Sequence, residues 1–156
     1  MRSVDRVRKY FNQRGLNIDV IELDASTRTA QLAADAVGTS LGSIVKSLIF
    51  IASDDRTILA LVAGDQRGDP AKIARCVGAD SVRMANGEQV RSRTTFAIGG
   101  VPPVAHDGQM ETLIDQTLLR FEIVWAAAGA PNALFAIEMK KLLELTQGRV
   151  ADIVVS

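Results

Sequence analysis

The middle of the chain reads VKSLIFIA from Val45 to Ala52 and ILALVA from Ile58 to Ala63, with the polar residues SDDR following the first run at 53–56. Both runs are rich in β-branched and large apolar side chains, which favour strands. A short polar connection between two such runs is typical of an antiparallel hairpin. We therefore expect a hairpin here, and the elements around it decide what kind of sheet it joins.

Helical and strand-like segments alternate irregularly around this hairpin. Helices are expected at about 3–14, at 30–37 between candidate caps at Thr27 and Thr29 and a closing Gly38, from Asp69-Pro70 to Gly78, from about Asn86, near 116–121 and at 139–145. Strands are expected at 17–23, 112–114, 123–128, 134–137 and 150–155, with turns at 40–43 and 129–132. Because hairpins and helical crossovers are mixed, we predict an α/β (mixed α+β) fold: a single compact domain, residues 1–156, with a mixed β-sheet surrounded by helices.

The composition is that of one globular domain, with 156 residues, 47% of them hydrophobic and 23% charged. The longest apolar runs are far shorter than the roughly 20 residues that span a bilayer, and the N-terminus lacks the apolar segment of a secretory signal. We therefore expect a cytoplasmic protein with no membrane partner.

The net charge of the chain predicts no strong overall attraction for nucleic acid, because 18 basic residues balance 18 acidic ones. DNA is therefore not an expected partner, and contact with RNA would need a local patch. The candidates in the middle third are Arg67, Lys72, Arg75, Arg83, Arg91 and Arg93. Charge patterning alone favours a solvated surface for these residues.

Several kinds of chemistry are excluded by counting. The chain has one histidine, His106, and one cysteine, Cys76, whereas a zinc site of nitrogen and sulfur ligands needs three or four. No metal site is expected, and Cys76 is interpreted as a packing residue among apolar neighbours. His106 lies beside Asp107 without a nucleophile-elbow sequence, so a surface or packing role is favoured over a Ser-His-Asp site. Neither a dinucleotide fingerprint nor a P-loop occurs, so no nucleotide cofactor is expected.

The segment FAIGGVPPV, from Phe96 to Val104, is expected to form a shaped loop. Its prolines remove backbone donors and its glycines permit unusual dihedral angles. Such a loop can direct N–H groups into a cleft and hold the negative charge that develops on a carbonyl oxygen. On this segment alone, an ordinary tight turn is the simpler interpretation.

Taken together, four stretches resemble the YbaK/ProX-type aminoacyl-tRNA deacylase family, which includes free-standing proteins and an editing domain of some prolyl-tRNA synthetases. They are TAQLAADAVG at 29–38, IVKSLIF at 44–50, FAIGGVPP at 96–103, and AAG at 127–129 through FAI at 135–137. Their order and spacing match from about residue 20 onward. The resemblance implies a compact mixed α/β fold and hydrolysis, without metal or organic cofactor, of the ester that joins an amino acid to the terminal adenosine of tRNA.

The same resemblance implies the site residues. By itself a lysine that opens an apolar strand is typical of a snorkelling surface residue, but the family's lysine falls on Lys46. Its ammonium would hold the terminal phosphate or polarise the ester carbonyl, and N–H groups at Gly100 and Val101 would hold the oxyanion. The expected substrate-binding residues are Thr29, Ser47, Ile49, Gly99, Pro102, Gly129, Leu134 and Phe135. A positioned water, one cation and fixed dipoles would then be sufficient for an activated ester, with help from the substrate's ribose hydroxyl or side chain.

The residues that follow the expected turn at 129–132 bear on which amino acid the substrate carries. Cysteinyl-tRNA(Pro) deacylases of this family carry an acidic residue there, whereas this chain has Ala133-Leu134-Phe135. A pocket of Leu134, Phe135 and Ile49 would favour a small apolar side chain, such as alanine or 2-aminobutyrate, although one methylene is worth only about 1–3 kcal/mol. The expected partners are the acceptor end of an aminoacyl-tRNA, with tRNA(Pro) as the expected tRNA, and prolyl-tRNA synthetase. Two alternatives remain: a non-catalytic module of the same fold that docks on a synthetase or tRNA, and an unrelated acyl hydrolase that uses His106.

Overall fold

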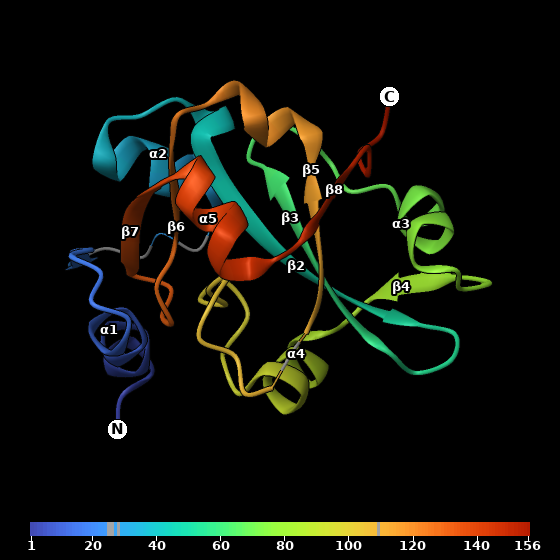
Figure 1. Ribbon diagram of the computed structural model, residues 1–156, viewed down its shortest axis with the longest axis horizontal. Coiled ribbons are helices and arrows are strands. Elements are labelled where there is room, and N and C mark those ends of the chain that lie inside the picture. The colour runs from blue at the N-terminus through green and yellow to red at the C-terminus, as the bar shows by residue number, and fades with distance from the viewer. Residues whose placement is uncertain (25–26, 28, 109) are drawn as a thin grey trace.

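The hairpin lies in the middle of a single sheet (Figure 1). The computed structural model describes residues 1–24, 27, 29–108 and 110–156. In this part of the chain eight strands form one sheet, in the order β1-β7-β6-β2-β3-β5-β8, with β4 paired to β2 outside that path. The predicted hairpin is confirmed as β2 (Ile44–Ala52) and β3 (Thr57–Ala63), which are antiparallel.

The sheet is mixed, as predicted. Its other strands are β1 (Val20–Glu22), β4 (Val82–Met84), β5 (Glu111–Asp115), β6 (Ile123–Ala127), β7 (Ala133–Glu138) and β8 (Arg149–Ala151). β2 pairs in parallel with β6, as do β3 with β5 and β5 with β8. The pairs β1–β7, β6–β7 and β2–β4 are antiparallel.

The helices begin and end close to the expected residues. They are α1 (Ser3–Gln13), α2 (Ala30–Val37), α3 (Pro70–Val77), α4 (Gly87–Thr94) and α5 (Met139–Thr146), with 3-10 turns at Leu41–Ser43 and Gln116–Arg120. The Thr29 hydroxyl accepts from the Leu32 amide at 3.2 Å, and α2 ends at Gly38 in the left-handed conformation. These caps explain why the sequence places α2 so accurately.

Three parts of the sheet differ from the sequence-based expectation. The first strand, expected at 17–23, is limited to Val20–Glu22, because only these three residues pair with β7. β4 was not predicted, because three residues are too few to show a period of two. The last strand, expected at 150–155, ends at Ala151. There Asp152 forms an ion pair with Lys72 at 2.9 Å, and the Ile153 amide donates to the Asp115 carboxylate at 2.9 Å. These contacts turn the chain away from β5 and toward α3.

The two faces of the β2–β3 hairpin carry different cores. On one face Val45, Ile49 and Ile51 pack in a core that also holds Phe11, Phe96 and Phe135. On the other face Phe50 packs with Ile58, Ile73 and Leu113. A smaller apolar cluster near the start of β2 joins α2 to the sheet through Ala33, Ala34, Ile44 and Leu134. Side chains therefore alternate between cores along β2, as a strand buried on both faces requires.

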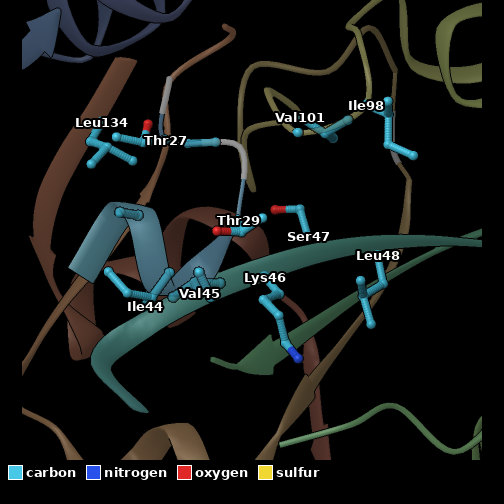
Figure 2. A pocket seen from close by; sticks show the side chains of 14 residues that line it. Thr27, Thr29, Ile44, Val45, Lys46, Ser47, Leu48, Ile98, Val101 and Leu134 are labelled. Atoms are coloured by element: carbon cyan, nitrogen blue, oxygen red, sulfur yellow. The ribbon is translucent and has the colours of Figure 1, made fainter. Parts of the chain in front are cut away.

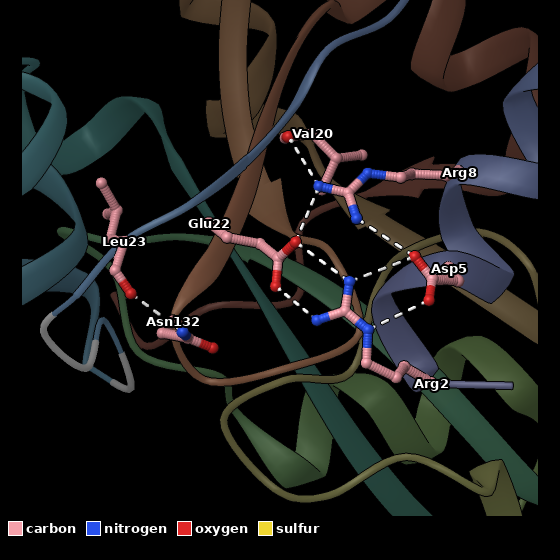
Figure 3. A network of polar contacts seen from close by, with 7 residues as sticks. All are labelled: Arg2, Asp5, Arg8, Val20, Glu22, Leu23 and Asn132. Atoms are coloured by element: carbon pink, nitrogen blue, oxygen red, sulfur yellow. Dashed lines mark hydrogen bonds and ion pairs between the residues drawn. The ribbon is translucent and has the colours of Figure 1, made fainter.

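Ionic contacts fasten α1 to β1 beside the turn between β6 and β7 (Figure 3). Arg2 and Arg8 each pair with both Asp5 and Glu22, at 2.9 to 3.1 Å. The Asn132 side chain donates to the Leu23 carbonyl at 2.9 Å. Leu23, directly after β1, is thus held against the β6–β7 turn.

Candidate active site

A gap in the sheet beside β2 forms the site. β3 pairs with β2 along one edge, from Val45 to Ile51. On the other edge β6 pairs with Ile44 and Val45, and β4 pairs with residues 50–52. Within the described residues, no strand pairs with residues 46–49 on this second edge. Side chains from both faces of β2 can therefore border the same space.

A cavity of about 190 Å³ occupies this gap (Figure 2). Its walls come from β2, the start of α2, the loop before Pro102 and the facing ends of β6 and β7. The lining residues are Thr27, Thr29, Ala30, Ala33, Ile44, Val45, Lys46, Ser47, Leu48, Ile98, Gly99, Val101, Ala127 and Leu134. Most are small or apolar, and Lys46 is the one titratable side chain among these described residues.

The wall made by α2 is tied to the rest of the site by its cap region. The buried Thr27 hydroxyl donates to the Pro131 carbonyl at 2.7 Å, and the Thr27 amide donates to the same oxygen at 2.5 Å. Ala30 and Ala33 lie three residues apart and therefore share the helix face toward the cavity. Small residues at both positions leave room between α2 and β2.

Lys46 is half-buried, and its ammonium donates to the Gln66 carbonyl. In Figure 2 this ammonium points away from the Ser47 hydroxyl, as alternation along a strand requires. Burial lowers the pKa of Lys46, and the nearby Asp65 carboxylate opposes that shift. Asp65 is itself held by Arg120 at 2.8 and 3.0 Å. The site therefore contains a partly desolvated cation beside a fixed carboxylate.

The glycine–proline loop does not present its amides as expected. The Gly100 amide donates to the Ala97 carbonyl at 3.0 Å, and the Gly100 carbonyl accepts from Gly129 at 2.9 Å. Gly100 therefore closes a turn behind the cavity, and the expectation of an oxyanion donor at Gly100 is wrong for this conformation. Gly99, with a φ of 85°, makes the left-handed bend that needs glycine. Val101 lines the cavity, and no acceptor for its amide occurs among the described residues.

The structure brings together only part of the predicted set. Lys46, Val101, Thr29, Ser47, Gly99 and Leu134 line the cavity. Gly100, Ile49, Pro102, Gly129 and Phe135 do not. Leu134 and Phe135 are neighbours on β7, so their side chains point to opposite faces, and Phe135 packs against Phe11 at a ring separation of 5.0 Å. Ile49 is likewise a core residue, 3% exposed.

Several lining residues were missed by sequence reasoning. They are Thr27, Ala30, Ala33, Ile44, Val45, Leu48, Ile98 and Ala127. The small residues Ala30 and Ala33 on one helix face were a readable signal, since they mark a place where α2 approaches a neighbour or leaves space. Ile98 is 51% exposed despite its apolar side chain, a signal that requires the structure.

His106 and Cys76 lie outside the cavity lining. The His106 Nε2 atom lies 2.7 Å from the Pro102 carbonyl oxygen, and the ring packs edge-on against Phe96. Because a carbonyl only accepts, Nε2 carries the proton. Burial lowers the pKa of His106, which favours the neutral ring. Cys76 is partly buried on α3 against the core around Phe50. Both residues have the packing role that the sequence favoured.

Two of the six residues in the predicted basic cluster form ion pairs on the surface in the described structure. Lys72 binds Asp152, and Arg93 binds Asp55 at 2.6 Å.

In the described ranges, no group of three or more histidine, cysteine or carboxylate side chains is placed to hold a metal ion. No helix in the same ranges is long and apolar enough to cross a membrane. The chemistry that the cavity offers is one cation, backbone dipoles and hydroxyl groups around a small apolar space.

Comparisons with known proteins point to one family. The model of a family described as the aminoacyl-tRNA editing domain matches residues 24–145. The uncharacterized protein YwhH of Bacillus subtilis (strain 168) is 36% identical over 150 residues, covering 95% of this chain and 94% of YwhH. EbsC of Enterococcus faecalis, named as a candidate Cys-tRNA(Pro)/Cys-tRNA(Cys) deacylase, is 24% identical over 125 residues, covering 80% of this chain and 76% of EbsC. The crystal structure of a candidate trans-editing enzyme for prolyl tRNA synthetase has a TM-score of 0.92 and 46% identity, covering 100% of this chain and 99% of that one.

Proposed function

Because the chain belongs to the aminoacyl-tRNA editing domain family, we propose that it is a deacylase that hydrolyses the ester between a wrongly attached amino acid and the terminal ribose of tRNA. Residues 1–156 would act as one domain, in trans, in the cytoplasm where charged tRNA is found. The likeness to EbsC and to the candidate trans-editing enzyme supports this proposal. The observation that carries it is the small cavity at the open edge of β2, with Lys46 beside it.

In the proposed reaction, a water molecule attacks the ester carbonyl and the carbonyl oxygen gains negative charge. The Lys46 ammonium and the Val101 amide stabilise that charge, and the ester C–O bond then breaks as the ribose oxygen takes up a proton. Lys46 must leave the Gln66 carbonyl to do this. Its long, flexible side chain at an unpaired strand edge permits the movement.

The cavity lining offers no strong side-chain base. Among its described residues there is no carboxylate and no imidazole. We therefore assign the positioning of the water to the substrate's own ribose hydroxyl. An ester is activated enough that orientation and fixed dipoles can carry most of the remaining acceleration.

The walls favour a small apolar side chain on the substrate. Ala30, Ala33, Ala127 and Leu134 contribute no charge and little bulk. We propose alanine or 2-aminobutyrate, attached to tRNA(Pro), with the acceptor end as the contacting part and prolyl-tRNA synthetase as a partner. One structural relative is described as a candidate trans-editing enzyme for prolyl tRNA synthetase, and this description supports the choice of tRNA(Pro).

A panel of labelled aminoacyl-tRNAs tests the proposal. Alanyl-, 2-aminobutyryl-, cysteinyl- and prolyl-tRNA(Pro) are mixed with excess protein, and release of amino acid is followed in a single turnover. We expect the alanyl and 2-aminobutyryl esters to be cleaved faster than the prolyl ester. Binding of every tRNA without any cleavage above the spontaneous rate would instead identify a non-catalytic module.

A further inference from the structure

The hydrogen bonds at both ends of β2 determine which way its peptide groups point. The Gly64 amide donates to the Ile44 carbonyl at 2.7 Å, and the Ala52 amide donates to the Arg56 carbonyl at 2.9 Å. Both bonds lie on the edge that pairs with β3. Even-numbered residues of β2 therefore direct their N–H and C=O groups toward β3, because peptide groups alternate between the two edges of a strand.

Odd-numbered residues of β2 direct these groups to the opposite edge. The Ile49 carbonyl accepts from the Ala85 amide there, at 2.9 Å. Ser47 is two residues earlier, so its N–H and C=O point to the same edge. Opposite Leu61 in β3, Ser47 forms the kind of pair that exchanges no hydrogen bond.

Ser47 lies in the gap between β6 and β4. β6 pairs with β2 no further than Val45, and β4 begins to pair at Phe50. Within the described chain, the Ser47 peptide group therefore has no strand partner, and it borders the cavity. An unpaired strand edge is a template for another strand-like group. Here the template is bounded by β6, β4 and α2, so that only a small group fits.

The Ser47 side chain is also without a partner. Its hydroxyl oxygen is buried and makes no hydrogen bond in the described structure. In Figure 2 this hydroxyl points toward the side of the cavity where Thr29 lies. Buried polar groups are almost always paired. A donor, an acceptor and a hydroxyl without partners on one residue indicate a ligand with its own donor and acceptor.

We propose that Ser47 binds the aminoacyl group of the substrate as if that group were a residue of an antiparallel strand. Residues of such a pair exchange two hydrogen bonds, one N–H to C=O in each direction. An aminoacyl ester carries the matching atoms: the α-amino group donates to the Ser47 carbonyl, and the ester carbonyl accepts from the Ser47 amide. This inference rests on the proposed deacylase function, whose substrate it describes.

The consequence is recognition of the amino-acid main chain itself. The Ser47 amide adds a donor at the carbonyl oxygen where negative charge develops. The Ser47 carbonyl selects esters with an α-amino group over simple acyl esters. Side-chain size is then read separately, by the alanine-lined walls.

A binding measurement tests this contact without catalysis. The stable amides 3′-alanylamino-3′-deoxyadenosine and 3′-propionylamino-3′-deoxyadenosine differ only in the α-amino group, and each is titrated into ¹⁵N-labelled protein. We expect the Ser47 amide proton to move downfield with both, and the alanyl compound to bind about three- to tenfold more tightly, the effect of one hydrogen bond. Equal affinities, no binding of either compound, or an unmoved Ser47 signal would overturn the inference.

A kinetic measurement with variants completes the test. Ser47→Pro lacks the amide hydrogen at a strand position whose N–H faces an open edge, where proline is tolerated, and Ser47→Ala is the matched variant that keeps it. We expect Ser47→Pro to cleave alanyl-tRNA(Pro) about three- to tenfold more slowly than Ser47→Ala. Wild-type rates on alanyl- and propionyl-tRNA(Pro), each divided by the spontaneous rate, should differ by a similar factor.

The outcomes separate the two proposals. If Ser47→Pro does not fold, the titration and the two wild-type rates still decide. If the adenosine compounds bind with the expected Ser47 shift but no aminoacyl-tRNA is cleaved, the deacylase proposal fails and the Ser47 contact stands. If cleavage occurs with equal corrected rates for alanyl and propionyl esters, the Ser47 contact is wrong and the deacylase proposal stands.

Discussion

Gly100 lies so close to Ala130 that a Cβ atom on Gly100 would stand 2.8 Å from the Ala130 Cα. The backbone atoms of Ala130 surround that position, so no flexible side chain can give way. The same contact is reinforced by the bond from the Gly129 amide to the Gly100 carbonyl, at 2.9 Å. The loop that carries Val101 is therefore held in place by the β6–β7 turn.

Gly100→Ala is expected to separate these two segments. The added methyl group must push Ala130 away, which costs about 1–3 kcal/mol of folding stability. Because Val101 moves with the loop, deacylation should also slow. Urea unfolding and single-turnover rates measure the two effects. Gly87→Ala is the control, since its Cβ would meet only Ile98, at 3.8 Å. Unchanged stability and rate in Gly100→Ala would show that the close approach is unimportant.

Lys46→Ala should remove activity and keep the fold. Loss of one stabilising group at a developing oxyanion lowers the rate by roughly 100- to 1000-fold. The Gln66 carbonyl loses its partner, so a stability decrease of about 1 kcal/mol is expected. Single-turnover deacylation is compared with that of Lys140→Ala, an exposed lysine on α5, with circular dichroism as folding control. Lys46→Arg should recover little activity if a compact charge is required. Equal rates for wild type and Lys46→Ala at saturating protein would remove Lys46 from the chemistry.

Asp65→Asn should lower the pKa of Lys46 further. The Asp65 carboxylate raises that pKa against the effect of burial, so its neutralisation favours loss of the lysine proton. The ammonium form should then disappear at a lower pH than in the wild type. An NMR titration of ¹³C-labelled lysine Cε follows this directly. Asp55→Asn, which removes a carboxylate paired with Arg93 instead, should leave the Lys46 titration in place. A shift in the opposite direction would contradict the electrostatic account.

His106 should make folding stability sensitive to acid without being needed for catalysis. Its pKa is lowered from 6.5 in the folded state, mainly by burial, so the unfolded chain binds the proton more readily. The stabilisation of the folded state that results from the lowered pKa of His106 is fully present above about pH 6.5. It is lost as the pH falls toward the folded-state pKa of His106. Since the chain has one histidine, His106→Gln should flatten the dependence of urea midpoint on pH near 6. This variant and His106→Ala should retain most deacylase activity. A collapse in rate with an intact fold would revive the acyl-hydrolase alternative.

Deacylation should be independent of transition metals. One histidine and one cysteine are too few for the usual zinc sites. Treatment with 1,10-phenanthroline, with magnesium kept present for the tRNA, should leave the rate unchanged. Inhibition that zinc reverses would refute this prediction.

Much of the architecture could be predicted because local chemistry decides it. The hairpin follows from two β-rich runs, and α2 follows from the Thr29 cap and the left-handed Gly38. The glycines and prolines of 96–104 exclude a regular strand. The resemblance to a deacylase family, carried by motifs in order, also came from the sequence, and it placed Lys46, Ser47 and Val101 at one site.

What the sequence by itself determined is therefore most of the elements, the family and part of the cavity lining. Only the tertiary structure decided where β2 is left unpaired, because that depends on where β6 ends and where the unpredicted β4 begins. It likewise decided that Leu134 reaches the cavity and Phe135 the core, and that the Gly100 amide closes a turn. The physical reason is common to these cases: strand register and close backbone approach join residues distant in the chain, and local patterns contain no information about them.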